Sequence, residues 1–536
     1  MSDLAPPTPR GPRHAAPRRR RRLWPSNRWA RLGLTVFIVF ALIIAGYAGY
    51  VTYQASRIKK VDVKNLTQGT QSGTAAGTEN ILMVGSTDRC ALKTQNPVYG
   101  LCSQGVTGVN SDVVMVLHLN PATHAVSILS IPRDLFIPNA RSTGANKIDA
   151  ALAEGPSQLV NAIQQDFGIP IQHFVELNFD TFAGVVDALG GINMYFPKRV
   201  YDAYSNLQQY HIGCDHLNGT QALTVVRARH LQYQPNDSYG PNTANWPQET
   251  QSDLARIRRN HEFIRVLAAQ VSAQGLSNPI TDAKLVAAVA PDLTVDSSLS
   301  TSDMANLILD YHSVNSQTAP QYTLPVMASN SYSYVYKGYD YGNVEFPDNG
   351  PDLETIQAFL GVSPTTNTVS GKALPKPSQV TVAVMNGSGA ANQASTTASA
   401  LQALGYKIST IGDATPVGNP AETLIQYNSH SPAVVAAAQR VLRSFDGQAI
   451  LAYDPAATIP VTVVTGTYFQ VHAPAPTKTT TTTTTTKPAH SSSTSTTVAP
   501  TTTSTTVPGF SATSAATTGL EPWDPRSCTA SGGEGP

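Results

Sequence analysis

The chain has 536 residues, a formal net charge of +1 at pH 7 and four cysteines. Its length exceeds that of one compact domain and predicts two folded units with additional segments. No two cysteines have zinc-finger spacing, which argues against a metal held by cysteine, and the near-zero charge averages very different segments and so indicates no partner.

Residues 1–31 form a basic segment with nine arginines and one acid, Asp3. Residues 32–53 then contain no charge, and these 22 residues are enough to cross a hydrocarbon core of ~30 Å at ~1.5 Å per residue. The excess of arginine on one side predicts a cytoplasmic N-terminus and an extracytoplasmic remainder. A cleaved signal peptide is the alternative. It would have a shorter apolar region and a small-residue cleavage site, so an uncleaved single-pass anchor in the cell membrane is expected.

Residues 54–78 are polar and rich in Gly, Thr and Ser, which predicts a stalk. The composition becomes globular over residues 79–362. At its start, residues 80–90 (NILMVGSTDRC) predict a buried strand that ends at Gly85, with Asp88 and Arg89 on the loop beyond it.

Two of the cysteines lie close together in the sequence. Cys90 and Cys102 are separated by a loop rich in Pro, Gly and Asn, so a disulfide between them is expected outside the membrane. It would contribute roughly 3 kcal/mol and would fix the loop. Cys214 and Cys528 have no evident partners.

Residues 111–149 hold the central feature of the domain. Two strands rich in Val, Ile and Leu flank an Asn-Pro turn, which predicts a β-hairpin. Asp112 opens the first strand, and Arg133 and Asp134 come where the second strand leaves the core. Lys147 follows shortly. Charged residues placed just beyond a buried strand indicate a site for a doubly negative group such as a phosphate with a metal.

The rest of the domain alternates between helical and strand patterns. The expected elements are a helix over 157–168, a strand over 173–179, a helix over 180–191 capped by Asp180, a strand over 192–197, a helix capped by Asn218, a long polar loop over 236–251 and a helix over 252–275. This alternation predicts an α/β or mixed α+β fold, with a layered central β-sheet flanked by helices.

Further cations lie on two of these helices. Arg227 and Arg229 lie at the end of the helix that Asn218 caps. Because they are two residues apart, they cannot share a helical face, so the chain must leave the helix there if both act together. Arg256, Arg259 and Asn260 share one face of the second. For these helical arginines, surface ion pairs are the alternative to a functional role.

A Pro/Lys linker over 363–378 precedes a second unit, residues 379–470, whose order β-α-β-β-α-β predicts a small α/β module. Its Asn386-Gly387-Ser388-Gly389 turn lacks the remaining residues of a P-loop or dinucleotide fingerprint. Residues 471–536 are rich in Thr, Ser and Pro, which predicts a disordered tail without a core.

The globular domain contains no nucleophile elbow, no HExxH and no cysteine nucleophile. Its arginines and aspartates suit phosphoryl chemistry instead. Guanidinium groups match phosphate oxygens in pairs, and aspartate oxygens suit Mg²⁺ shared with a pyrophosphate.

The segments SDVVMVLHLNP, SILSIPRDLFI, KIDAALAEG, LNGTQALTVVRARH and SDLARIRRNHEFI, in this order, resemble the LytR-CpsA-Psr family over residues 78–362. Residues 379–469 resemble the LytR C-terminal domain. The resemblance implies an extracytoplasmic phosphotransferase that moves a glycopolymer from a polyprenyl-pyrophosphate carrier onto peptidoglycan through a phosphodiester bond. It also implies Mg²⁺, or Mn²⁺ in its place, at the pyrophosphate.

Site residues follow from the matched motifs. The resemblance implies that Asp112 and Asp88 bind the metal. Arg133, Asp134, Arg227 and Arg229 would take part in catalysis, with Asp134 as base or as a structural ion-pair partner. The expected pyrophosphate ligands are Arg89, Arg133, Lys147, Arg227, Arg229, Arg256 and Asn260.

Two positions depart from the family pattern. Thr87 stands where the family has its first acid, which shifts that role to Asp88, and Asn260 stands where the family has Gln. Two other functions are compatible with the sequence: a non-catalytic envelope scaffold that binds wall glycan, and a hydrolase that releases the polymer to water. A nucleic-acid partner is not expected, because the basic segment has no helix-turn-helix and directly precedes the anchor.

Overall fold

The computed structural model describes residues 45–68, 77–93, 95, 97, 100–274, 279–311, 314, 319–328, 333–417, 421–472, 519–529 and 532–534. Residues 1–53 and 54–536 are separate units. The basic segment and the first part of the expected anchor, residues 1–44, lie outside the described residues, and residues 45–55 are helical. Within the described ranges, no helix combines the length and apolar character needed to span a membrane.

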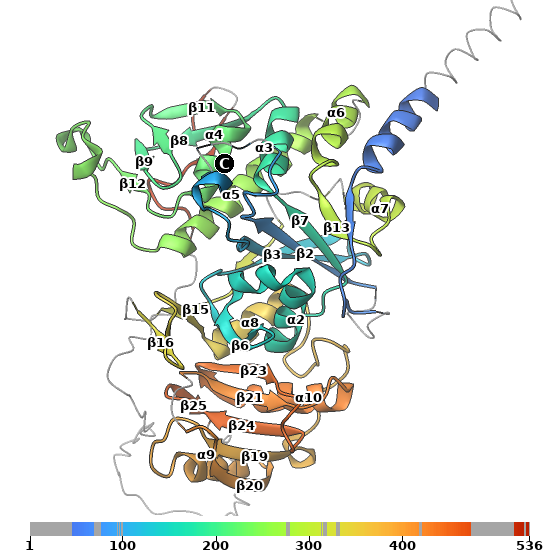
Figure 1. Cartoon of the computed structure of the whole chain (residues 1–536), viewed down its shortest axis with the longest axis vertical. Helices are drawn as coiled ribbons and strands as arrows, with labels where there is room; N and C mark the ends of the chain where they lie inside the picture. Colours follow the sequence, from blue (N-terminus) through green and yellow to red (C-terminus); the bar gives the residue numbers. More distant parts are fainter. Residues whose placement is uncertain are drawn as a thin grey trace, which may run out of the picture. The chain divides into compact units, whose positions relative to one another are not determined.

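A seven-stranded sheet forms the centre of the first globular domain (Figure 1). Its order is β1 (Lys59–Val61), β13 (Thr294–Asp296), β7 (His173–Leu177), β2 (Glu79–Ser86), β3 (Ser111–Asn120), β4 (Ala125–Ile131) and β14 (Gln321–Thr323). The expected hairpin is present, because β3 and β4 pair antiparallel with Val114 opposite Ile131. β2 runs antiparallel to β3 and parallel to β7, so the sheet is mixed.

The prediction of a stalk over 54–78 is wrong for residues 59–66, which belong to the folded domain. β1 pairs parallel with β13 at the edge of the sheet, and Val63 and Leu66 are buried in the same core. A three-residue strand with two lysines carries too weak a pattern to be recognised in a polar segment.

Helices cover the sheet and carry the later motifs. They are α2 (Pro156–Phe167), α3 (Phe179–Ala188), α4 (Gly219–Arg227), α5 (Ser252–Gln274), α6 (Pro279–Val289), α7 (Thr301–Tyr311) and α8 (Asn349–Leu360), with a 3-10 helix η4 (Ile148–Glu154) after the hairpin. The expected capping of α4 is confirmed, since Asn218 and Gln221 form a reciprocal capping box. The cap expected at Asp180 is wrong: Asn178 caps α3, and Asp180 accepts from the Lys93 N–H instead.

The long helix α5 is held against the sheet by polar as well as apolar contacts. Leu254 and Ile257 belong to the main core, and His261 Nε2 lies 2.7 Å from Ser130 Oγ of β4. Burial lowers the pKa of His261 to about 4, so this contact is between neutral groups at pH 7. The helix therefore presents a defined face to the ends of β3 and β4.

Smaller sheets complete this domain. They are β10 (Leu207–Gln209), β9 (Val200–Asp202) and β12 (Gln232–Tyr233); β11 (Gly213–Leu217), β8 (Ile192–Phe196) and β26 (Arg526–Ser527); β5 (Phe136–Arg141) and β6 (Gly144–Lys147); β15 (Val326–Ala328) and β18 (Glu345–Pro347); and β16 (Val335–Tyr336) and β17 (Tyr339–Asp340). The long polar loop after β12 contains the 3-10 helices η5 (Asp237–Tyr239) and η6 (Thr243–Asn245).

The C-terminal module, residues 379–470, contains the expected β-α-β-β-α-β order and three further strands, β22, β24 and β25. It comprises β19 (Thr381–Asn386), α9 (Gln393–Ala403), β20 (Lys407–Asp413), β21 (Thr423–Tyr427), α10 (Pro432–Leu442), β22 (Phe445–Gly447), β23 (Ala449–Tyr453), β24 (Val461–Thr465) and β25 (Phe469–Val471). The sheet order β20-β19-β24-β21-β23 places the unforeseen β24 at its centre. The Asn386 turn is closed by its own side chain, as the turn interpretation requires.

The disordered tail expected over 471–536 is wrong for residues 519–529. Within this segment, β26 pairs with β8, and Asp524 is fully buried. Cys528 forms a disulfide with Cys214, so both cysteines for which the sequence offered no partner are paired. The expected Cys90–Cys102 disulfide is confirmed, with a Cα–Cα distance of 5.1 Å.

Candidate anion-binding site

The ends of β3 and β4 bring a carboxylate and two guanidinium groups together. Asp112 lies at the start of β3, and its Oδ1 forms an ion pair with Arg133 Nη1, which follows β4. Arg256, on α5, reaches the same place: its Nη2 donates to the Asp112 backbone carbonyl at 2.8 Å, and its Nη1 lies 3.9 Å from Asp112 Oδ1. The two strands of one hairpin and a helix more distant in the sequence thus meet at Asp112.

Asp134 is the second carboxylate of this cluster. Its oxygens lie 2.7 Å from Arg229 Nη2, 2.9 Å from Lys147 Nζ and 3.6 Å from Arg133 Nε. Burial opposes its ionisation, but the charges of Arg133, Arg229 and Lys147 outweigh burial and lower its pKa. A carboxylate with a lowered pKa and three cationic partners is a weak base, so the geometry favours the ion-pair alternative for Asp134.

Arg227 and Arg229 reach the cluster because α4 ends between them. Ala228 leaves the helix in an extended conformation, with φ −61° and ψ 124°. The N–H of Arg229 then donates to Asp202 Oδ2 at 2.8 Å, which fixes the turn. This is the departure from helical geometry that the two-residue spacing requires.

The aromatic ring of Phe179 supports two of the predicted cations. The guanidinium carbon of Arg89 lies 5.3 Å from the ring centroid, and that of Arg227 lies 4.9 Å from it. Cation–π contacts of this length are worth about 0.5–1 kcal/mol each when exposed. Phe179 therefore orients a loop residue and a helix residue toward each other.

The electrostatics of Asp112 show that the cations act on one place. Burial opposes its ionisation, yet the charges of Arg256, Arg133, Arg89 and Arg227 outweigh burial and lower its pKa. The pKa of Arg256, which is 3% exposed, is lowered in turn by burial and by the neighbouring guanidinium groups. An excess of buried positive charge of this kind favours an anionic ligand.

Three acids of the cluster were missing from the predicted site. Asp253 pairs with Arg256 Nη2 and lies 3.6 Å from Arg229 Nε. Asp149 is buried next to Arg133, and burial raises its pKa to about 6. Glu345 starts β18 and donates its N–H to the Asp134 carbonyl at 3.0 Å. Asp253 lies in the first turn of the predicted helix over 252–275, where an acid is common, and Glu345 lies in a segment without any motif.

The structure places the remaining predicted residues as follows. Asn260 lines a small cleft with Asp112, Asp253 and Arg256, and its buried Oδ1 has no hydrogen-bond partner among the described residues. Its shorter side chain therefore still reaches the cluster. Asp88 lies on the loop, where its Oδ1 accepts from the N–H groups of the two residues that follow Arg89.

The residues present fit a metal ion that is held by one protein carboxylate together with substrate phosphates. In the described part of the chain, no group of three or more His, Cys, Asp or Glu side chains could hold a metal ion. Mg²⁺ commonly binds through one or two carboxylates and substrate phosphates, so such a group is not required. Asp112 is the carboxylate at the centre of the cluster, and its Oδ1 pairs with Arg133 and lies 3.9 Å from Arg256 Nη1.

Comparison with known proteins identifies two regions. The model of the LytR_cpsA_psr family matches residues 43–347, and that of the LytR cell envelope-related transcriptional attenuator (LytR_C) matches residues 379–469. The chain is 31% identical over 265 residues to the Probable cell wall biosynthesis protein LcpB of Corynebacterium glutamicum, covering 49% of this chain and 56% of that protein. It is 26% identical to LcpA of the same organism over 421 residues, covering 70% of this chain and 75% of LcpA.

A third relative is matched over a shorter stretch. The polyisoprenyl-teichoic acid–peptidoglycan teichoic acid transferase TagU of Bacillus mycoides is 30% identical over 131 residues, covering 24% of this chain and 42% of TagU. The chain thus spans about half the length of LcpB and of TagU. Among solved structures, a LytR-Csp2A-Psr enzyme from Actinomyces oris has 27% identity and a TM-score of 0.40, covering 50% of this chain and 88% of that one.

Proposed function

The chain belongs to the LytR-CpsA-Psr family, and we propose that it is an extracytoplasmic phosphotransferase anchored in the membrane by its N-terminal apolar segment. Its substrate is a glycopolymer on a polyprenyl-pyrophosphate carrier, and its acceptor is peptidoglycan. The names of TagU and LcpB, which place those relatives in teichoic acid transfer and in cell wall biosynthesis, support the choice of substrates.

One observation carries the proposal: cationic side chains from distant segments surround Asp112 and Asp134. They are Arg89, Arg133, Lys147, Arg227, Arg229 and Arg256. The acids of the cluster are Asp112, Asp134, Asp149, Asp253 and Glu345. Of these, Glu345 has a pKa of about 8 and is largely uncharged at neutral pH. The cluster therefore holds net positive charge, which a pyrophosphate diester would neutralise.

Binding exchanges one set of ion pairs for another. Without ligand, the guanidinium groups are paired with Asp112, Asp134 and Asp253. Phosphate oxygens accept hydrogen bonds from paired guanidinium N–H groups with good geometry. The pyrophosphate of the substrate can therefore replace these carboxylates as the partner of the guanidinium groups, and no buried cation is left unpaired.

The reaction is a displacement at phosphorus. A hydroxyl oxygen of the peptidoglycan acceptor attacks the phosphorus attached to the glycan, and the bond from that phosphorus to the bridging oxygen breaks. The glycan becomes linked through a phosphodiester, the polyprenyl monophosphate leaves, and the hydroxyl proton is released. Arg133, Arg229 and Arg256 would neutralise the charge that develops on the leaving phosphate.

Mg²⁺ would be held by Asp112 and would supply further neutralisation of the pyrophosphate charge when bound. Asp88 is a weaker candidate because its Oδ1 already accepts two backbone N–H groups.

The test is a transfer assay with the purified protein. A labelled polyprenyl-pyrophosphoryl glycan is incubated with peptidoglycan with and without Mg²⁺, using wild type and Arg133→Ala. We expect label to become attached to peptidoglycan in the wild type and to be reduced at least tenfold in the variant, since a charge-assisted hydrogen bond is worth about 1.5–3 kcal/mol. No attachment by the wild type would support a non-catalytic scaffold role, and attachment that the substitution leaves unchanged would show that Arg133 is not used. Release of free glycan to water would identify a hydrolase.

A further inference from the structure

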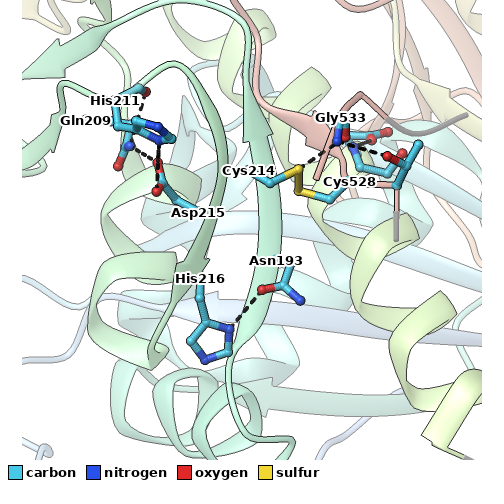
Figure 2. The surroundings of a disulfide bond; sticks show 11 residues. Asn193, Gln209, His211, Cys214, Asp215, His216, Cys528 and Gly533 are labelled. Atoms are coloured by element: carbon cyan, nitrogen blue, oxygen red, sulfur yellow. Dashed lines mark hydrogen bonds and ion pairs between the residues drawn. A yellow bond between two sulfur atoms is a disulfide. The ribbon is translucent and has the colours of Figure 1, made fainter. Parts of the chain in front are cut away.

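The segment 519–529 is built into the first domain, although 46 residues of Thr/Ser/Pro-rich sequence separate it from the second unit. Its strand β26 pairs with β8 and extends the two-stranded β8–β11 sheet, with Arg526 opposite Tyr195. Trp523 stacks on Tyr233, with ring centroids 4.0 Å apart. Figure 2 shows Cys528 of this segment bonded to Cys214 of β11, a link between residues 314 positions apart.

Asp524 is the part of this segment that enters the protein interior. It is 0% exposed, and its carboxylate lies 2.6 Å from Arg258 Nε and 3.3 Å from Arg259 Nη1. Both arginines are buried on α5, with exposed fractions of 5% and 0%. Glu249 provides the second carboxylate, at 2.6 Å and 2.8 Å from Arg259. Two buried cations therefore face two acids, and one of those acids comes from the end of the chain.

Arg259 connects this buried network to the anion-binding cluster. Its Nη2 donates to the backbone carbonyl of Ala228 at 2.6 Å. Ala228 is the residue at which the chain leaves α4, between Arg227 and Arg229. Arg256 lies one helical turn before Arg259 on the same helix. The buried network thus contacts both segments that deliver the later arginines of the cluster.

We propose that Asp524 is a positioning residue for the anion-binding site: by neutralising Arg258 and Arg259, it holds α5 and the Ala228 turn where Arg227, Arg229 and Arg256 converge. The Cys214–Cys528 disulfide keeps the segment that carries Asp524 in place. The site is complete only when the end of the chain is docked. This inference rests on the proposed function, because it assumes that the cluster binds pyrophosphate.

Positioning and simple charge predict opposite signs for one substitution. Asp524→Asn removes a negative charge near a cationic site, so electrostatics alone would strengthen anion binding. If Asp524 positions the arginines, the same change leaves a buried cation unneutralised, α5 and the Ala228 turn shift, and anion binding becomes weaker. A purely structural role would lower thermal stability and leave the affinity of the folded protein unchanged.

The experiment measures binding of inorganic pyrophosphate to the full-length protein in detergent by calorimetry, well below the unfolding temperature. We expect Asp524→Asn to weaken binding about tenfold, equivalent to about 1.4 kcal/mol. The matched control is Glu534→Gln, which removes an acid whose side chain is 50% exposed and which pairs with Arg526. The control is expected to bind within about twofold of wild type, because exposed ion pairs contribute little. Equal or tighter binding by Asp524→Asn would overturn the proposal.

A second measurement does not depend on a buried substitution. A protease site is placed within residues 473–518, and the protein is cut with the disulfide intact or with Cys528 replaced by Ser. The cut protein with the disulfide keeps the segment and should bind pyrophosphate like the uncut protein. The cut Cys528→Ser protein loses the segment and should bind pyrophosphate as weakly as Asp524→Asn. Unchanged affinity after loss of the segment would refute the positioning role.

Failure of the proposed function would be recognised separately. If the wild type binds no pyrophosphate, that function is wrong, and amide hydrogen exchange then decides the positioning role alone. Faster exchange over residues 225–232 and 252–262 in Asp524→Asn, but not in Glu534→Gln, supports it. Unchanged exchange in both contradicts it.

Discussion

Glu345 connects β18 to the anion-binding cluster, and its ionisation should set a pH limit on stability. Its Oε2 is buried and has no hydrogen-bond partner among the described residues. Burial and the charges of Asp253 and Asp134 raise its pKa to about 8, although Arg229 and Arg256 partly offset them. An unfolded Glu has a pKa of about 4.3. Between these two values, the folded protein retains a proton that the unfolded chain releases.

The sign and size of the effect follow from this difference. The free energy of unfolding decreases as pH rises from the unfolded pKa through the folded pKa, and it levels off above pH 8. Between pH 6 and pH 9 the full loss would be about 2.7 kcal/mol, and the partly exposed side chain reduces it to about 2 kcal/mol. Glu345→Gln cannot ionise at this position and should lack this part of the pH-dependent loss of unfolding free energy.

Urea unfolding at pH 6 and pH 9 measures the loss in each protein. Glu422, whose pKa burial also raises to about 8, contributes equally to wild type and variant, so their difference isolates Glu345. Glu354→Gln, on the exposed face of α8, is the control and should retain the loss of the wild type. An equal loss of unfolding free energy in wild type and Glu345→Gln would refute the reasoning.

Three further substitutions test the site and its support. Arg133→Lys keeps the charge but loses the paired donors, and calorimetry should show pyrophosphate binding at least about tenfold weaker; wild-type affinity would show that the guanidinium fork is not used. Phe179→Leu removes the ring beneath Arg89 and Arg227 and should weaken the same binding by about 1–2 kcal/mol in total, whereas a fall in melting temperature alone would indicate only a packing role. Gly219→Ala places a Cβ 2.2 Å from a backbone oxygen of α3, so α4 must shift; we expect about 1–3 kcal/mol of destabilisation in thermal unfolding, and an unchanged melting temperature would contradict this.

Much of the first domain could be predicted from local patterns. The hairpin of β3 and β4, the capped helix α4 and the long helix α5 have strong periodicity and clear end signals, and the structure contains all three. The placement of Arg133 just after a buried strand and of Arg229 just after a helix end also followed from local geometry. These predictions succeeded because each depends on neighbouring residues only.

The missed features depend on contacts between distant residues. Asp524 lies in a terminal sequence dominated by small polar residues, and only its ion pairs with Arg258 and Arg259 reveal its role. The pairing of Cys214 with Cys528 joins residues 314 positions apart and leaves no local signal. Glu345 lies near Asp134 through strand pairing that no motif marks. Composition averaged over a segment hides a few residues that fold against another part of the chain.

The central claim is that guanidinium groups from distant segments bind one pyrophosphate. The most direct test is a crystal structure of the protein with geranyl pyrophosphate, a short stand-in for the carrier lipid. The account predicts phosphate oxygens within hydrogen-bond distance of Arg133, Arg229 and Arg256, next to Asp112. A pyrophosphate bound elsewhere, with these arginines still paired only with Asp112, Asp134 and Asp253, would contradict it.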